Sequence, residues 1–266
     1  MSPSLSRRTA LALAAAALVG ALASGCAGPS APALDPTLRD PAKNAAVKPV
    51  PRDANWVKRH DGFVAIAKQG GVDVLFVGDS ITDAWRNADP VKGGKAIWDA
   101  RFAPLRAANF GISGDRTQHV LWRLQNGELD GIRPKAVVLM IGTNNTGFER
   151  DGTTRRNTPA ETVAGITLIV EHLRAKQPQA KILLLAIFPR GEKPDHPQRL
   201  QLAEINAAIA RFHDGRSVHF LDINRVFLAA DGTLPKDIMP DFLHPGAQGY
   251  ALWADAIKDP LAALLR

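Results

Sequence analysis

Short apolar runs that end at glycine or polar residues, separated by segments with helical spacing, constrain the fold of this chain more than any other feature. The clearest run is 72–77, which ends at Gly78. Such a run is typical of a strand covered on both faces, as in a parallel sheet. Because parallel strands need crossover connections, the alternation predicts an α/β fold. The five predicted strands are 72–77, 106–109, 136–141, 181–187 and 218–223.

The segments between these runs have the apolar spacing of amphipathic helices. Right-handed crossovers place such helices on both faces of a parallel sheet. Ligands of these sheets bind outside the carboxyl ends of the strands, so site residues should directly follow strands. Asp115 is expected to cap one of the helices. The predicted helices are 56–68, 115–125, 159–176, 199–212 and 246–257.

The N-terminus predicts export. Arg7 and Arg8 precede an apolar stretch, 10–23, that is too short and too rich in alanine for a membrane span. We therefore expect residues 1–25 to be a signal peptide, of either the general or the twin-arginine type. The mature protein is expected to be exported, as a periplasmic protein or a lipoprotein anchored in a bacterial envelope.

Cys26 decides between these two destinations. The segment 23–26 resembles a bacterial lipobox, although Ala23 stands where leucine is usual. Cys26 is the only cysteine, and a free thiol would be unusual in an oxidising compartment. This favours Cys26 as a lipid anchor, and the alternative is a signal-peptidase site with an incidental cysteine.

The rest of the chain divides into a linker and one domain. Residues 26–54 are rich in proline and alanine and have no apolar period, so a flexible tether is expected there. Residues 55–266 form one predicted α/β domain. The net charge is +7, but no basic run is interleaved with aromatic residues, so no nucleic-acid partner is expected. The histidines show no metal-ligand spacing, so neither a metal nor a cofactor is expected.

Polar residues of the type needed for ester hydrolysis follow the predicted strands. Ser80 directly follows the first strand, and Asp241 and His244 precede the last helix. A serine hydroxyl needs a base to take its proton during attack. A spacing of three in a helical turn would bring Asp241 to the imidazole, leaving the second ring nitrogen for Ser80.

Donors for a developing oxyanion are expected at the same strand ends. We assign this role to the backbone N–H groups of Ser80 and Gly111 and to the side-chain amide of Asn144. Gly111 would also let a substrate carbonyl approach the main chain, because it has no Cβ. Asp79 is expected to brace the loop, Ser113 to be a turn residue, and Asp222 is an alternative triad acid.

These blocks resemble the ordered motifs of SGNH/GDSL hydrolases, and the segment 56–265 resembles the catalytic subunits of brain-type platelet-activating factor acetylhydrolase. The resemblance implies a flavodoxin-like three-layer α/β/α sandwich, a Ser–Asp–His triad without metal, and short acyl groups, acetyl above all. It also implies self-association, as a homodimer. The loop 148–159 departs from the family, because it is longer and more charged. The blocks are Gly78-Asp79-Ser80, Gly111, Gly142-x-Asn144 and Asp241-x-x-His244.

The sequence therefore predicts a serine esterase that hydrolyses short-chain esters through an acyl-enzyme on Ser80. One alternative is a carbohydrate O-acetylesterase that acts on envelope or plant polysaccharide. An alternative of another class is a non-catalytic envelope-binding protein on the same fold. The expected partner is accordingly a small ester or an acetylated glycan, and membrane contact is expected only through Cys26.

Overall fold

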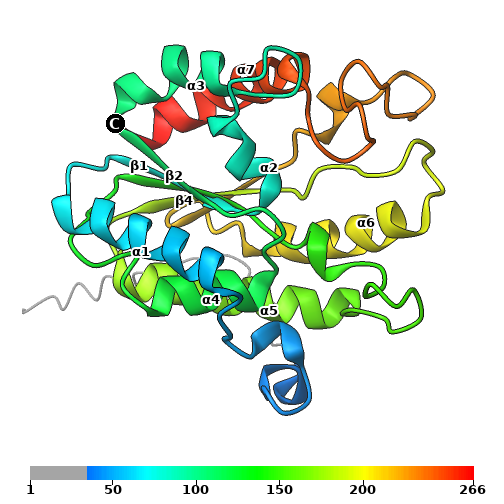
Figure 1. Cartoon of the computed structure of the whole chain (residues 1–266), viewed down its shortest axis with the longest axis horizontal. Helices are drawn as coiled ribbons and strands as arrows, with labels where there is room; N and C mark the ends of the chain where they lie inside the picture. Colours follow the sequence, from blue (N-terminus) through cyan, green and yellow to red (C-terminus); the bar gives the residue numbers. More distant parts are fainter. Residues whose placement is uncertain (1–34) are drawn as a thin grey trace, which may run out of the picture.

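The chain folds around a five-stranded parallel β-sheet, as the alternating apolar runs predict (Figure 1). The computed structural model describes residues 35–266. The strand order across the sheet is β2-β1-β3-β4-β5. This order, with helices on both faces, confirms the flavodoxin-like α/β/α sandwich. The strands are β1 (Val74–Gly78), β2 (Ala107–Gly111), β3 (Ala136–Met140), β4 (Lys181–Leu185) and β5 (Val218–Leu221).

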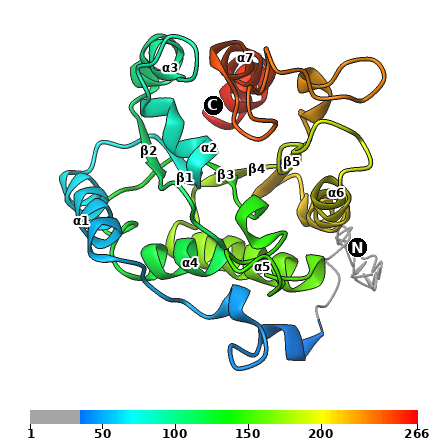
Figure 2. The ribbon, with the colours of Figure 1, turned by 45° about the vertical axis from the view of Figure 1, so that its right-hand side comes forward.

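Two layers of helices enclose the sheet, as Figure 2 shows from a second direction. One face is covered by α1 (Ala54–Gln69), α4 (Thr117–Gln125), α5 (Pro159–Lys176) and α6 (Pro197–Ile209). The other face is covered by α2 (Ser80–Asp83), α3 (Lys95–Arg101) and α7 (Ala247–Leu264). The sequence did not predict α2 and α3, which have four and seven residues and are too short to show a helical period. Short 3₁₀ helices occur at Pro36–Arg39, Ala45–Val47, Ala84–Arg86, Ala103–Leu105, Thr143–Asn145, Ala210–Phe212 and Asn224–Phe227.

Each strand contributes side chains to both layers, because successive residues of a strand point to opposite faces. On β1, Leu75 and Val77 pack in the core beneath α1 and α4. Val74 and Phe76 pack in the opposite core, beneath α3 and α7. All four side chains are completely buried, which explains why the strand appears in the sequence as a continuous apolar run.

Part of the segment predicted to be a flexible tether, 26–54, packs onto the domain instead. Residues 36–47 form two 3₁₀ turns against α4 and α5. Ala46 is completely buried, and the side-chain amide of Asn44 donates to the backbone oxygen of Glu161 at 3.2 Å. The tether prediction is therefore wrong for this part. Its prolines prevent long helices but permit short 3₁₀ turns, which show no period in the sequence.

The predicted signal peptide, 1–25, and the lipid-anchor candidate Cys26 lie outside the described residues. Export and lipidation therefore stay predictions. Within residues 35–266, no helix has both the length and the hydropathy needed to cross a bilayer.

The strand order positions a site at the carboxyl ends of the strands. β1 lies between β2 and β3, so the chain leaves β1 toward β2 on one side and reaches β3 on the other. A crevice forms at the carboxyl ends of the strands where the order reverses in this way. The residues that follow these strands, Ser80, Ser113 and Asn144, therefore gather at one crevice.

Candidate active site

Ser80 is the first residue of α2 and directly follows β1. The turn between them is tight, because a Cβ on Gly78 would lie 2.9 Å from the Cβ of Thr82 in α2, and it would also lie 2.6 Å from the carbonyl oxygen of Met140 in β3. Asp79 braces the helix start, with Oδ1 accepting from the N–H of Ile81 at 3.0 Å. Burial raises the pKa of Asp79 to about 7. As the first helical residue, Ser80 has an N–H that no carbonyl within the helix can accept.

Three side chains from distant parts of the chain lie in series at this point. His244 Nε2 lies 2.9 Å from Ser80 Oγ, and His244 Nδ1 lies 2.6 Å from Asp241 Oδ2. These distances fit a hydroxyl that donates to Nε2 and an Nδ1–H that donates to the carboxylate. Burial acts to raise the pKa of Asp241, but the hydrogen bonds from His244 outweigh it and hold the pKa below its usual value. The structure thus brings together all three side chains that the sequence singled out.

The turn that carries Asp241 and His244 differs from the helical turn expected from their spacing. α7 begins only at Ala247, and Phe242 adopts a left-handed backbone conformation with a φ of 57°. Asp241 Oδ1 accepts the N–H groups of Leu243 at 3.0 Å and His244 at 2.7 Å. One carboxylate oxygen therefore fixes the turn while the other orients the imidazole. A left-handed residue other than glycine costs about 1–3 kcal/mol and is typical of functional sites.

Gly111, to which the sequence assigned an oxyanion donor, has no free amide. Its N–H donates to Oδ1 of Asn109 at 2.9 Å. A Cβ on Gly111 would lie 2.5 Å from the backbone nitrogen of Asp83. Glycine is therefore needed at this position so that β2 can pack closely against α2. The predicted oxyanion role of Gly111 is wrong.

Gly114, in the loop that follows β2, has the amide whose geometry suits the oxyanion role. Its φ is +81°, and its N–H has no acceptor among the residues that the structure describes. Gly114 and Asn144 line one pocket together. The Nδ2 of Asn144 donates one hydrogen to the backbone oxygen of Asp115 at 2.9 Å. The second Nδ2 hydrogen has no acceptor within residues 35–266. The sequence reasoning missed Gly114 as an oxyanion donor. The signal that could have identified it is a glycine directly before an aspartate, Asp115, in the loop after a strand.

A buried ionic network supports this loop. Asp115 does not cap α4 as expected, because its carboxylate points inward and accepts from Arg123 Nε at 2.9 Å and Trp56 Nε1 at 2.7 Å. Arg123 is completely buried, pairs with Glu128 at 2.6 Å, and donates to the backbone oxygen of Gly78 at 3.4 Å. One guanidinium therefore connects the loop after β2 to the end of β1, where the nucleophile candidate begins.

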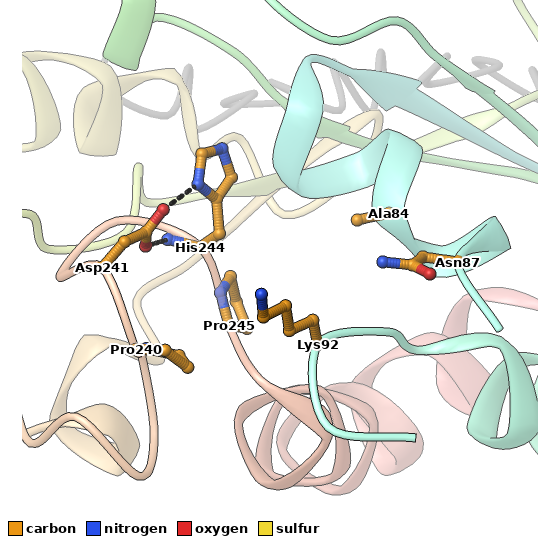
Figure 3. A pocket seen from close by; sticks show the side chains of 7 residues that line it. All are labelled: Ala84, Asn87, Lys92, Pro240, Asp241, His244 and Pro245. Atoms are coloured by element: carbon orange, nitrogen blue, oxygen red, sulfur yellow. Dashed lines mark hydrogen bonds and ion pairs between the residues drawn. The ribbon is translucent and has the colours of Figure 1, made fainter. Parts of the chain in front are cut away.

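Two pockets meet at the imidazole. Ser80 and His244 line the first, of about 490 Å³, which we call the triad pocket. The second, of about 420 Å³, lies between the loop 240–245 and the side chains of Asn87 and Lys92 (Figure 3). Their volumes are in the usual range of small-molecule sites. The crevice can therefore hold a substrate on both sides of the imidazole.

The other residues that the sequence singled out lie outside the series formed by Ser80, His244 and Asp241. Ser113 lines the triad pocket, and its N–H donates to Asp83 at 3.0 Å, as suits a turn residue. Asp222, the alternative triad acid, is exposed and accepts from the N–H of Asn224 at 2.8 Å. Within residues 35–266, no group of three or more His, Cys, Asp or Glu side chains is arranged to hold a metal ion.

The chain is similar to known hydrolases over most of its length. A model of the GDSL-like lipase/acylhydrolase family matches residues 76–252. The platelet-activating factor acetylhydrolase IB subunit alpha2 of Rattus norvegicus is 39% identical over 221 residues, which cover 83% of this chain and 89% of the rat protein.

Solved structures of two bacterial hydrolases share the fold. A GDSL-like lipase from Bacteroides thetaiotaomicron has a TM-score of 0.60 and 21% identity, and the match covers 77% of this chain and 97% of that protein. An acetylxylan esterase from Geobacillus stearothermophilus has a TM-score of 0.53 and 21% identity, and the match covers 71% of this chain and 93% of that protein. At these identities the likeness concerns the fold.

Proposed function

Because the chain belongs to the GDSL-like lipase/acylhydrolase family and is a carboxylic ester hydrolase, we propose that it hydrolyses short-chain esters, acetyl esters above all, through an acyl-enzyme on Ser80. The observation that carries this proposal is the unbroken series from Ser80 Oγ through the imidazole to the carboxylate of Asp241. The preference for acetyl rests on the similarity to the rat acetylhydrolase subunit.

The geometry supports a two-step acyl transfer. Ser80 Oγ attacks the ester carbonyl while His244 Nε2, at 2.9 Å, takes its proton. Asp241 stabilises the imidazolium, which then protonates the leaving alcohol. Water attacks the acyl-enzyme by the same route and releases the acid.

We assign the oxyanion to three donors: the N–H groups of Ser80 and Gly114, and the free Nδ2 hydrogen of Asn144. All three lie at the strand ends that form the crevice. Removal of one such donor typically costs about 10²–10³-fold in kcat. Gly114 replaces Gly111 in this assignment, because the Gly111 amide is already bonded.

A carbohydrate O-acetylesterase is the second candidate. The fold is shared with an acetylxylan esterase, and the pocket beside Asn87 and Lys92 gives a sugar leaving group room next to the imidazole. The export predicted from the N-terminus would bring the protein to acetylated polysaccharides. Turnover of acetylated glycans, compared with that of simple esters of increasing acyl length, separates the two candidates.

Replacement of Ser80 by alanine tests the proposal. Because the nucleophile is lost, Ser80→Ala should lower kcat for p-nitrophenyl acetate by at least about 10⁴-fold. The matched control is Ser113→Ala, which removes another hydroxyl from the triad pocket and should keep kcat within about tenfold of the original. Circular dichroism checks that both variants are folded. Undiminished turnover by Ser80→Ala would exclude Ser80 as the nucleophile.

A further inference from the structure

A third pocket, of about 510 Å³, opens beside the oxyanion donors. Gly114 and Asn144 form part of its wall, so it adjoins the point at which the ester carbonyl would bind. Most of the remaining wall consists of basic side chains from three separate segments of the chain. We call it the arginine pocket, and its arginines are Arg52, Arg116, Arg150 and Arg156.

The loop that supplies two of these arginines is ordered by its own contacts. Phe148 and Arg155 form an antiparallel bridge, and the N–H of Glu149 donates to the oxygen of Thr154 at 2.8 Å. The carboxylate of Asp151 accepts from the backbone of the same turn, with the N–H of Thr154 at 2.8 Å. The backbone at Arg150 and Arg156 is therefore held by contacts within the loop. This is also the loop whose length and charge depart from the family in the sequence.

The pocket has more positive than negative charge. Glu149 is shared, with Arg116 at 2.6 Å and Arg156 at 3.5 Å. Arg150 has no ion-pair partner among the described residues. Asp151 is the other carboxylate in the wall, and the turn already uses its oxygens. The wall therefore presents four guanidinium groups against two carboxylates.

Three of the four arginines have a carboxylate partner, since Arg52 pairs with Asp115 at 3.1 Å and Glu149 serves Arg116 and Arg156, so Arg150 supplies the uncompensated charge. His119, also in the wall, cannot contribute a charge of its own at neutral pH. Burial lowers its pKa to about 3, and the neighbouring cations Arg52, Arg116 and Arg123 act in the same direction.

We infer that the arginine pocket binds an anionic group, a carboxylate or a phosphate, carried by the alcohol part of the ester. The inference rests on the proposed function, since an acetyl group cannot carry the charge itself. Arginine guanidinium groups recognise both anions through paired hydrogen bonds. The oxyanion donors would hold the carbonyl at the edge of the pocket, so an anion a few bonds away can reach the arginines. The substrate class is acetyl esters of acidic alcohols, such as sugar acids or phosphorylated polyols.

Matched pairs of esters test this substrate class. Monoacetylated galacturonic acid is compared with its methyl ester, and acetylglycerol 3-phosphate with acetylglycerol. In at least one pair, kcat/KM should be about tenfold or more higher for the anion, as a charged hydrogen bond provides. If only the first pair shows a preference for the anion, the substrate is an ester of a sugar acid. If only the second pair shows it, the substrate is an ester of a phosphorylated alcohol. Equal or lower kcat/KM for the anion in both pairs overturns the inference.

Two variants from one loop locate the effect. Arg150→Gln should lower the anion-to-neutral ratio of kcat/KM by about tenfold, because it removes the cation without a partner. Arg155→Gln is the matched control, because Arg155 lies in the same hairpin but lines a different pocket, where it covers the ring of Phe148. It should leave the ratio unchanged. An unchanged ratio in Arg150→Gln, or an equal loss in Arg155→Gln, contradicts the inference.

A binding measurement separates this inference from the proposed function. Galacturonate and glycerol 3-phosphate are titrated into the Ser80→Ala protein by calorimetry, which needs no hydrolysis. Saturable binding of either anion that Arg150→Gln weakens supports the pocket even if no ester is turned over. Absence of binding by both anions overturns the pocket, while turnover of p-nitrophenyl acetate independently decides the esterase activity.

Discussion

Asp79 lies directly before Ser80 and is buried. Burial raises its pKa from 3.8 in the unfolded reference to about 7. Between these two pH values the folded protein binds more protons at this site than the unfolded chain does. The free energy of unfolding contributed by Asp79 is therefore greatest below pH 3.8 and decreases as the pH rises toward 7.

Asp79→Asn should remove this pH dependence. The amide keeps an oxygen for the N–H of Ile81 but does not ionise. Between pH 5 and pH 8, the original protein should lose about 2–3 kcal/mol of stability relative to the variant. Urea denaturation of both proteins at the two pH values measures this difference, from which titrations common to both cancel. Parallel pH profiles would show that Asp79 stays ionised in the folded state.

The sequence predicted those site residues whose role depends on type and position along the chain. Ser80 was identified because it directly follows an apolar run, and His244 because an aspartate lies three residues before it. Sequence reasoning failed where a side-chain hydrogen bond, whether local or buried, decides the role. Only the side chain of Asn109 makes the Gly111 amide unavailable, and only burial against Arg123 turns Asp115 inward.

At the scale of elements, the helix layer that contains α4 and α5 depends on a close approach at Gly165 in α5. A Cβ there would lie 2.5 Å from Oγ1 of Thr117 in α4 and 2.7 Å from the oxygen of Ala46. Thr117 Oγ1 itself donates to that oxygen at 2.8 Å. Three segments therefore meet where no side chain fits, which explains a glycine inside a long helix.

Gly165→Ala and Gly62→Ala should change stability in opposite directions. Alanine gains about 1 kcal/mol of helix propensity at either site. At Gly165 the clash should outweigh this gain, for a net loss of about 1–3 kcal/mol. A Cβ on Gly62, in the interior of α1, would have no neighbouring atom within 4 Å, so alanine there should stabilise the protein by up to about 1 kcal/mol. Thermal unfolding measures both, and a shift of the same sign would contradict the packing argument.

Elements that carry their own period were predicted, and those that depend on tertiary contacts were not. The run 136–141 and the spacing in 159–176 gave β3 and α5 nearly to the residue. The turns in 36–47 form because Asn44 and Ala46 find partners on α4 and α5. The sequence of that segment has no periodicity from which these contacts could be predicted.

At the scale of the whole molecule, two apolar cores share one sheet. Ile166 of α5 belongs to the core on one face, and Ile257 of α7 to the core on the other. Both side chains are completely buried. Since every strand contributes to both layers, neither core can be lost without exposing the sheet to water. The domain is therefore expected to unfold as a unit.

Ile166→Ala and Ile257→Ala test this coupling. Each should lower the free energy of unfolding by about 2–5 kcal/mol, because each leaves a cavity in a close-packed core. The transitions followed by tryptophan fluorescence and by circular dichroism should coincide in both variants. Separated transitions in either variant would show that the two layers unfold independently.

Labelling with a fluorophosphonate tests most directly whether the hydroxyl, imidazole and carboxylate act as one unit. We predict one adduct per chain, located on Ser80 by peptide mass spectrometry. Labelling should slow by at least about 10³-fold in His244→Ala, because the base that activates the hydroxyl is gone. An adduct on another residue, or labelling of His244→Ala at the original rate, would contradict the account.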